Sequence, residues 1–131
     1  MLIITGFFAA ILAIFYVFLS LNVVKNRSRS RMPLVFWEDP RLTEAIRAHG
    51  NFSEYTPIFL ILLALMEVNS SSGLWLYIAG GVFTLARLLH AFSILVHEPK
   101  TESLKIRIIG MILTFIPILS ISVFLIVKFF S

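Results

Sequence analysis

Long apolar runs alternate with short polar stretches along the chain, and the lengths of the runs predict four membrane-crossing helices. The first run, "MLIITGFFAAILAIFYVFLSLNVV", follows no basic segment, ends in no small-residue cleavage site and is longer than the core of a signal peptide. It predicts a retained helix over about 2–24, and two later runs predict helices over about 74–96 and 107–128. The pattern therefore predicts an all-α membrane protein, a single domain over 1–131 built as a four-transmembrane-helix bundle.

The second helix is expected to begin well outside the membrane. Asp39 and Pro40 are typical of an N-cap and the first helical position. A helix from Pro40 to Glu67 would be about 42 Å long, which exceeds a hydrocarbon core of about 30 Å. Its membrane part is therefore expected over about 54–69, with Glu67 simply marking the outer end. Pro99 is expected to end the third helix.

Composition and charge support the membrane class and suggest an orientation. Hydrophobic residues make up 59% of the chain and charged residues 14%, below the roughly 25% of soluble domains, and the mean hydropathy is +0.96. The absence of cysteine excludes disulfides and a protein thiol nucleophile. Lysine and arginine gather in the first and third connections, so the positive-inside rule predicts both termini outside the cytoplasm. No helix pair is broken or unusually short, which makes a transporter or channel the less favoured class.

Polar side chains from several helices are expected at one depth. Counted from the outer helix ends, Glu54 and Arg87 both lie about 20 Å from the outer surface. Arg47, Asn51 and Glu54 follow the i, i+4, i+7 spacing of one helix face. The same layer is expected to include Arg27, His90 and Arg107. Charges at this depth usually face a bundle interior or a cavity, and the excess of arginine over carboxylate favours an anionic ligand.

Purely structural roles remain open for these residues. Arg47 and Glu54 could form an ion pair between helices, and Asn51 an interhelical hydrogen bond. Arg87 could extend to the cytoplasmic interface, and Arg107 could anchor the positive side of the bundle. The histidines are consistent with ordinary packing. No two of them are spaced i, i+4, so no metal site is predicted.

Three motifs carry a resemblance to a known family: "RAHGNFSEYTP" in the second helix, "ARLLHAF" in the third and "KIRIIGM" at the start of the fourth. They resemble the MAPEG family, the membrane-associated proteins in eicosanoid and glutathione metabolism. The resemblance covers nearly the whole chain, which is most similar to short bacterial inner-membrane members. It implies a homotrimer that binds glutathione, as a co-substrate, between neighbouring subunits on the cytoplasmic half.

The resemblance also implies roles for individual residues and a function. Arg107 would stabilise the glutathione thiolate as the catalytic residue. The implied glutathione-binding residues are Arg27, Arg47, His49, Asn51, Glu54, Tyr55, Arg87 and His90. The activity would be conjugation of glutathione to lipophilic electrophiles, or reduction of lipid hydroperoxides, with the second substrate arriving from the bilayer. Ile94 stands where several family enzymes have tyrosine, which favours the alternative of a non-catalytic lipid-binding or scaffold protein on the same fold. Nothing in the sequence suggests nucleic acid.

Overall fold

The computed structural model of the protein describes residues 1–30, 39–69 and 72–130, and its elements are helical. The long helices are α1 (Ile3–Ser30), α2 (Pro40–Asn69), α3 (Gly73–Phe92) and α5 (Lys105–Phe130). A π-helical turn, η1 (Ser93–His97), and the short helix α4 (Glu98–Thr101) prolong α3. Within the described residues, four segments are long and apolar enough to cross a membrane. The prediction of an all-helical chain with four spans is therefore confirmed.

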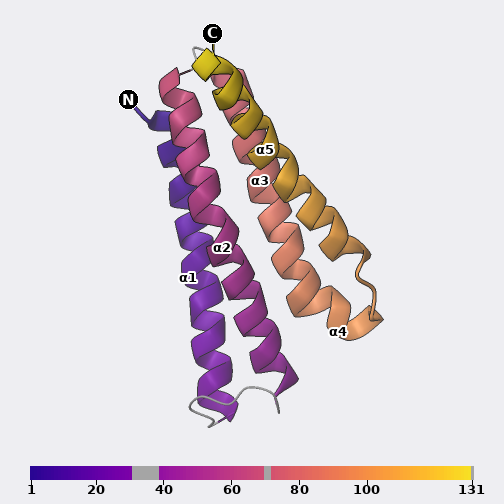
Figure 1. Cartoon of the computed structure of the whole chain (residues 1–131). Helices are drawn as coiled ribbons and strands as arrows, with labels where there is room; N and C mark the ends of the chain where they lie inside the picture. Colours follow the sequence, from indigo (N-terminus) through magenta and orange to yellow (C-terminus); the bar gives the residue numbers. More distant parts are fainter. Residues whose placement is uncertain (31–38, 70–71, 131) are drawn as a thin grey trace.

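The long helices form two closely packed pairs, α1 with α2 and α3 with α5 (Figure 1). The pairs lie close together at the end of the bundle where both chain termini are found. They diverge toward the opposite end, which carries α4 (Figure 1). The candidate site lies toward this end, in pockets lined by residues of α2 and of the η1–α4–α5 segment.

The centre of the bundle is filled by aromatic and aliphatic side chains. The ring of Phe59 from α2 stacks on the ring of Phe83 from α3, with centroids 3.8 Å apart and planes at 4°. The ring of Phe8 from α1 lies directly over Gly80, where any side chain would collide with it. Many other large apolar side chains point outward. That distribution suits a bundle whose surroundings are lipid, because hydrocarbon does not penalise exposed apolar surface.

Helices α3 and α5 pack closely against each other at Gly110. A Cβ atom at Gly110 would lie 3.1 Å from both the backbone nitrogen and the Cβ of His90, and 3.2 Å from the carbonyl oxygen of Ala86. Small residues allow such contacts in membrane bundles, where close packing rather than water exclusion holds helices together. The contact fixes the first turns of α5 beside the end of α3.

Two helix ends test the sequence expectations directly. A carboxylate oxygen of Asp39 accepts hydrogen bonds from the backbone N–H groups of Arg41 at 3.0 Å and Leu42 at 3.4 Å, which confirms the predicted N-cap of α2. The expectation that Pro99 ends the third helix is wrong, because helical structure continues to Thr101. Pro99 falls in the first turn of α4, where a missing N–H is tolerated.

The first helix is longer than its apolar run. It continues through the basic stretch that follows residue 24 and ends at Ser30, with Arg27 and Arg29 in its last turn. Arginine has a high helix propensity, and positive charge is favourable near a helix C-terminus. The basic residues therefore extend the helix beyond the membrane part expected from hydropathy.

Glu67 has a structural role that its position at the end of α2 did not suggest. Its two carboxylate oxygens accept hydrogen bonds from the backbone N–H groups of Ile4 at 3.0 Å and Thr5 at 2.7 Å. These first-turn amides have no partner within their own helix, and a negative charge also interacts favourably with the helix dipole. Glu67 therefore caps α1 and ties it to the end of α2.

Candidate functional site

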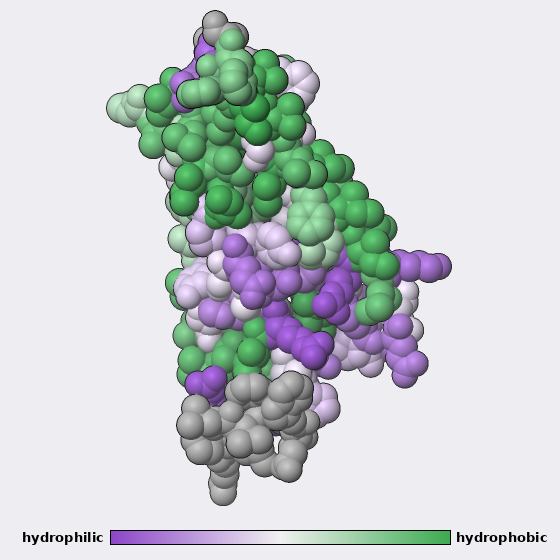
Figure 2. Space-filling view, in the orientation of Figure 1, coloured by the Kyte–Doolittle hydropathy of each residue, from purple (hydrophilic) through white to green (hydrophobic). Residues whose placement is uncertain are grey.

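A pocket of about 370 Å³ lies between α2 and the start of α5. Arg47, Asn51 and Glu54 line one wall from successive turns of a single face of α2, as their spacing predicts. Ile94 of η1 and Arg107 of α5 line the opposite wall. Figure 2 shows hydrophilic side chains gathered on the half of the visible face that lies away from the chain termini, next to a broad hydrophobic region. The structure thus brings together four of the predicted site residues from two distant parts of the chain.

A second pocket, of about 480 Å³, adjoins the first, and both are lined by Arg47, Ile94 and Arg107. Its further lining includes three acidic residues, Glu44, Glu98 and Glu102. Of these two pockets, Glu54 lines only the first, and the other three carboxylates line only the second. Arg47 and Arg107, which line both pockets, therefore lie between the two groups of carboxylates. This charge distribution suits a zwitterionic ligand with anionic groups near the junction and an ammonium toward one end.

Arg107 forms an ion pair within its own chain. Its Nη1 lies 3.5 Å from Oε2 of Glu98, and the hydroxyl of Ser93 donates a hydrogen bond of 3.0 Å to the other carboxylate oxygen. Reasoning from the sequence missed both partners. Glu98 could have been suspected, because it precedes Arg107 across a short connection and is expected at the same depth.

Arg87 lies beneath the pocket rather than on its wall, with 1% of its surface exposed. Its Nη1 donates hydrogen bonds to the side-chain oxygen of Asn51 at 3.0 Å and to the Asn51 carbonyl at 3.4 Å. Its guanidinium carbon lies 5.3 Å from the ring centroid of Tyr55. Within the described residues no carboxylate pairs with it. Because Arg87 donates to the amide oxygen of Asn51, the amide NH₂ is the donor that Asn51 can offer to a ligand.

Comparison with known proteins identifies the family of the chain. The model of the MAPEG family matches residues 5–127. The chain belongs to the MAPEG family. It is 31% identical over 90 residues to the protein named "Inner membrane protein YecN" of Escherichia coli strain K12, and equally to the YecN of E. coli O6:H1 strain CFT073; each match covers 69% of both chains. No solved structure matches. The family and the bacterial inner-membrane relatives that the motifs suggested are therefore confirmed, and the chain is an integral membrane protein.

The other predicted site residues of this MAPEG protein, Arg27, His49, Tyr55 and His90, do not line either of the two pockets. His49 faces α1, with Nε2 at 3.0 Å from the hydroxyl of Ser20 and its ring 4.8 Å from that of Tyr16. Arg27 is exposed in the last turn of α1. Neither residue lines the two pockets of the same chain.

Tyr55 and His90 lie inside the bundle. The Tyr55 ring is half-buried and packs edge-on against Phe115 at 5.7 Å. His90 is buried one turn beyond Arg87, against Gly110. A direct contact of either residue, or of Arg87, with a ligand stays a prediction. In the described part of the chain no group of three or more histidine or acidic side chains is placed to hold a metal ion.

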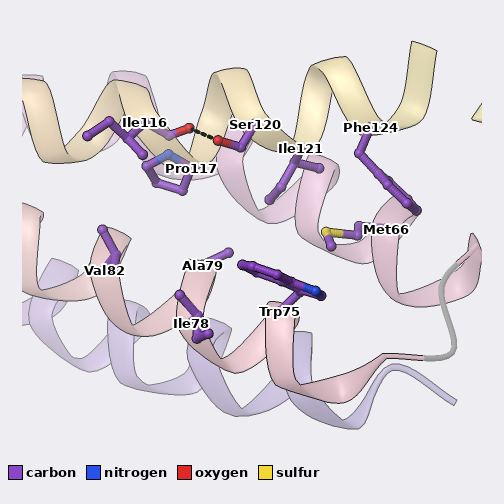
Figure 3. A pocket seen from close by; sticks show the side chains of 10 residues that line it. All are labelled: Met66, Trp75, Ile78, Ala79, Val82, Ile116, Pro117, Ser120, Ile121 and Phe124. Carbon is purple, nitrogen blue, oxygen red and sulfur yellow. Dashed lines mark hydrogen bonds between the residues drawn. The ribbon is translucent and has the colours of Figure 1, made fainter. Parts of the chain in front are cut away.

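An apolar pocket of about 360 Å³ lies between α3 and α5 toward the end of the bundle that carries the termini (Figure 3). Trp75, Met66, Pro117 and Phe124 contribute to its lining, and the hydroxyl of Ser120 is bonded to a backbone carbonyl of its own helix at 2.7 Å. Pro117 and Phe124 lie about 15 and 25 Å beyond Arg107 along the helix. The apolar pocket is therefore too far from the arginines to share their chemistry.

Proposed function

We propose that this MAPEG protein is a glutathione-dependent membrane enzyme that activates the thiol of glutathione for reaction with lipophilic substrates. The observation that carries the proposal is the meeting of Arg47, Asn51, Glu54 and Arg107 around one pocket in a membrane helix bundle. Ionic side chains at this depth are costly and mark functional sites.

The chemistry of glutathione matches that of the pocket. Glutathione has two carboxylates, one ammonium and one thiol. Guanidinium groups bind carboxylates through paired, charge-assisted hydrogen bonds, which suits Arg47. The Asn51 amide can donate to a ligand oxygen, and the Glu54 carboxylate can accept from the ammonium. The ligand therefore requires the residue types that the α2 face presents.

Arg107 is the residue to which we assign thiol activation. A free thiol has a pKa near 8.5, and the thiolate rather than the thiol is the nucleophile. Lowering that pKa by two units requires about 2.7 kcal/mol of selective thiolate stabilisation. A guanidinium at the edge of a partly dry pocket supplies energy of this order.

Two reactions follow from an activated thiolate. In conjugation the sulfur forms a C–S bond at an electrophilic carbon, and the leaving group departs with the electron pair of the broken bond. In peroxide reduction the sulfur takes one oxygen of a lipid hydroperoxide and releases the alcohol. A second glutathione thiol then condenses with the sulfenic acid that has formed, which gives the disulfide and releases water. A site at membrane depth admits such substrates directly from the bilayer.

The same proposal includes a homotrimer. Arg27 and His49 lie on the α1 side of the subunit, away from its own pocket. In a homotrimer they would contribute to the glutathione site of a neighbouring subunit, as the family resemblance implies. Native mass spectrometry that finds a species other than three copies would refute this part.

The rival is a non-catalytic lipid-binding or scaffold protein. Two observations favour it: Ile94 gives the pocket wall no hydroxyl, and Arg107 already has an acidic partner. The rival predicts saturable lipid binding without thiolate formation.

The deciding experiment titrates the purified, detergent-solubilised protein with glutathione and records heat and ultraviolet thiolate absorbance together. The wild-type protein should bind glutathione and show a rise in thiolate. Arg107→Ala should lose most of the thiolate, because a thiol pKa that returns from about 6.5 to about 8.5 lowers the thiolate fraction at pH 7 by about 25-fold. Lys105→Ala, two residues away and outside the pocket lining, is the matched control and should behave as wild type. Binding without thiolate would favour the rival, and full thiolate in Arg107→Ala would refute the role given to Arg107.

We also propose that both termini lie outside the cytoplasm and that the pocket faces the cytoplasm. The termini share one end of the bundle, and the arginine-rich end of α1 lies at the other (Figure 1). Because the chain has no cysteine, a single Asn69→Cys variant should react with an impermeant maleimide in intact cells. Lys100→Cys should react only after the membrane is opened. The reverse pattern would invert the proposed orientation.

A further inference from the structure

The side chain of Glu98 is held at both of its carboxylate oxygens. One oxygen lies 3.5 Å from Nη1 of Arg107, and the other accepts a 3.0 Å hydrogen bond from the hydroxyl of Ser93. Ser93 is fully buried, and the side chain of Glu98 is 18% exposed. Glu98 is therefore oriented by the interior of the bundle while its charge faces the pocket arginine.

The π-helical turn is what places Ser93 and Glu98 together. In an α-helix, residues five apart lie about 140° apart around the axis and face different directions. In η1 the backbone N–H of Glu98 instead bonds to the carbonyl of Ser93, an i to i+5 contact that brings the two residues onto one side. The same turn contains Ile94, which lines the pocket. Single π turns of this kind occur frequently at functional sites.

The two pocket arginines differ in their charge partners. Arg107 has Glu98, whereas within the described residues no carboxylate lies within ion-pair distance of Arg47. An anionic ligand therefore meets one available guanidinium and one that is already occupied. The Glu98–Arg107 pair is long, and the Arg107 side chain is 36% exposed. Such a pair is weak enough for a bound anion to replace.

We propose that Glu98 is a positioning residue that holds Arg107 when no ligand is bound and competes with a bound thiolate for the same guanidinium. This inference rests on the proposed function and adds a residue to it. The hydrogen bond from Ser93 keeps the Glu98 carboxylate beside Arg107, so the competing negative charge is already in place when an anion binds. Removal of the negative charge of Glu98 releases Arg107 to the ligand. The neutral amide of a Glu98→Gln variant has nearly the same shape and can still accept from Ser93.

The first test measures how available Arg107 is, independently of glutathione. Phenylglyoxal reacts with guanidinium groups, and the rate at each arginine can be followed by mass spectrometry of peptides from the intact, detergent-solubilised protein. In Glu98→Gln the rate at Arg107 should rise about twofold to fivefold, the range expected for loss of a partly exposed ion pair. The rate at Arg47 in the same sample is the internal reference and should not change. Glu102→Gln, an acid that lines the same pocket without pairing to Arg107, is the matched control.

The second test titrates glutathione into the same proteins and follows its thiolate absorbance against pH. Glu98→Gln should bind glutathione about twofold to fivefold more tightly and form thiolate at lower pH. Glu67→Gln removes the same charge outside the lining of both pockets and should match wild type in glutathione binding. A merely structural role of Glu98 would not move the thiol titration to lower pH. If glutathione binds wild type and Glu98→Gln equally, or if the Arg107 modification rate is unchanged, the Glu98 inference is overturned. If no protein binds glutathione, the proposed function is overturned, and the modification rate alone decides whether Glu98 holds Arg107.

Discussion

Arg87 places a guanidinium inside the bundle with Asn51 as its shortest hydrogen-bond partner, and Asn51→Ala tests what that contact contributes. Hydrogen bonds to charged groups contribute about 1.5–3 kcal/mol, and an unpaired buried charge is costlier still. The contacts that survive the change include the Asn51 carbonyl at 3.4 Å and the sulfur of Met111 at 3.9 Å. The rings of Tyr55 and Phe83, with centroids at 5.3 and 6.0 Å, also remain. We therefore expect Asn51→Ala to lower the free energy of unfolding by about 2 kcal/mol, in the lower half of that range.

A double-mutant cycle isolates the part that belongs to Arg87. Arg87→Met keeps a long side chain and removes the charge, so the bundle interior no longer holds a guanidinium that needs an acceptor. In that background Asn51→Ala should cost less than about 0.5 kcal/mol, which gives a coupling energy of at least about 1.5 kcal/mol. Asn69→Ala, an exposed asparagine on the same helix, is the control and should change stability by no more than about 0.5 kcal/mol.

The assay is reversible unfolding in mixed micelles of a non-ionic detergent and dodecyl sulfate, followed by far-ultraviolet circular dichroism. Midpoints and slopes from each variant are compared by linear extrapolation. Equal losses from Asn51→Ala in the wild-type and Arg87→Met backgrounds would refute the reasoning. The cost would then arise from the asparagine alone and not from the arginine that it binds.

Other predictions concern helix contacts and can be measured by the same unfolding assay. Gly110→Ala should lower the unfolding free energy by about 1–3 kcal/mol, because its Cβ would press on the backbone of α3. Gly81→Ala meets nothing within 4 Å and should be neutral or stabilising by up to about 1 kcal/mol; similar results for the two glycine variants would contradict the packing argument. Glu67→Gln should lower stability by about 1 kcal/mol, because the charged cap of α1 is lost. Glu102→Gln is its control, and an equal loss in that variant would show that Glu67 acts only through overall charge.

The α2 wall of the site could be predicted from the sequence because helix periodicity is a local property. The spacing of Arg47, Asn51 and Glu54 places them on one face wherever the helix lies. Their shared depth with Arg107 could be predicted because the apolar part of each helix has to match the hydrocarbon thickness. The Asp39 cap of α2 was equally local, and it is present as predicted.

The partners of the charged residues could not be predicted in this way. Glu98 was overlooked because five-residue spacing places Ser93 and Glu98 on different faces of an ordinary α-helix, and only the π turn brings them together. Arg87 has the depth of a ligand-binding residue, yet it turns inward to Asn51. Its direction depends on how α3 is rotated against α2, which spacing along one helix does not specify.

By itself the sequence determined the four apolar spans, the polar layer near one end of the bundle and the family. These features depend on run length, period and short motifs, all of which are carried by neighbouring residues. The tertiary structure decided which polar side chains meet. The close approach of α3 and α5 at Gly110 brings Arg107 to Glu98, and the divergence of the helix pairs opens the pocket beside Arg47. A side chain in a membrane bundle acquires its partner from the rotation and separation of whole helices, and these are set by packing among residues far apart in the chain.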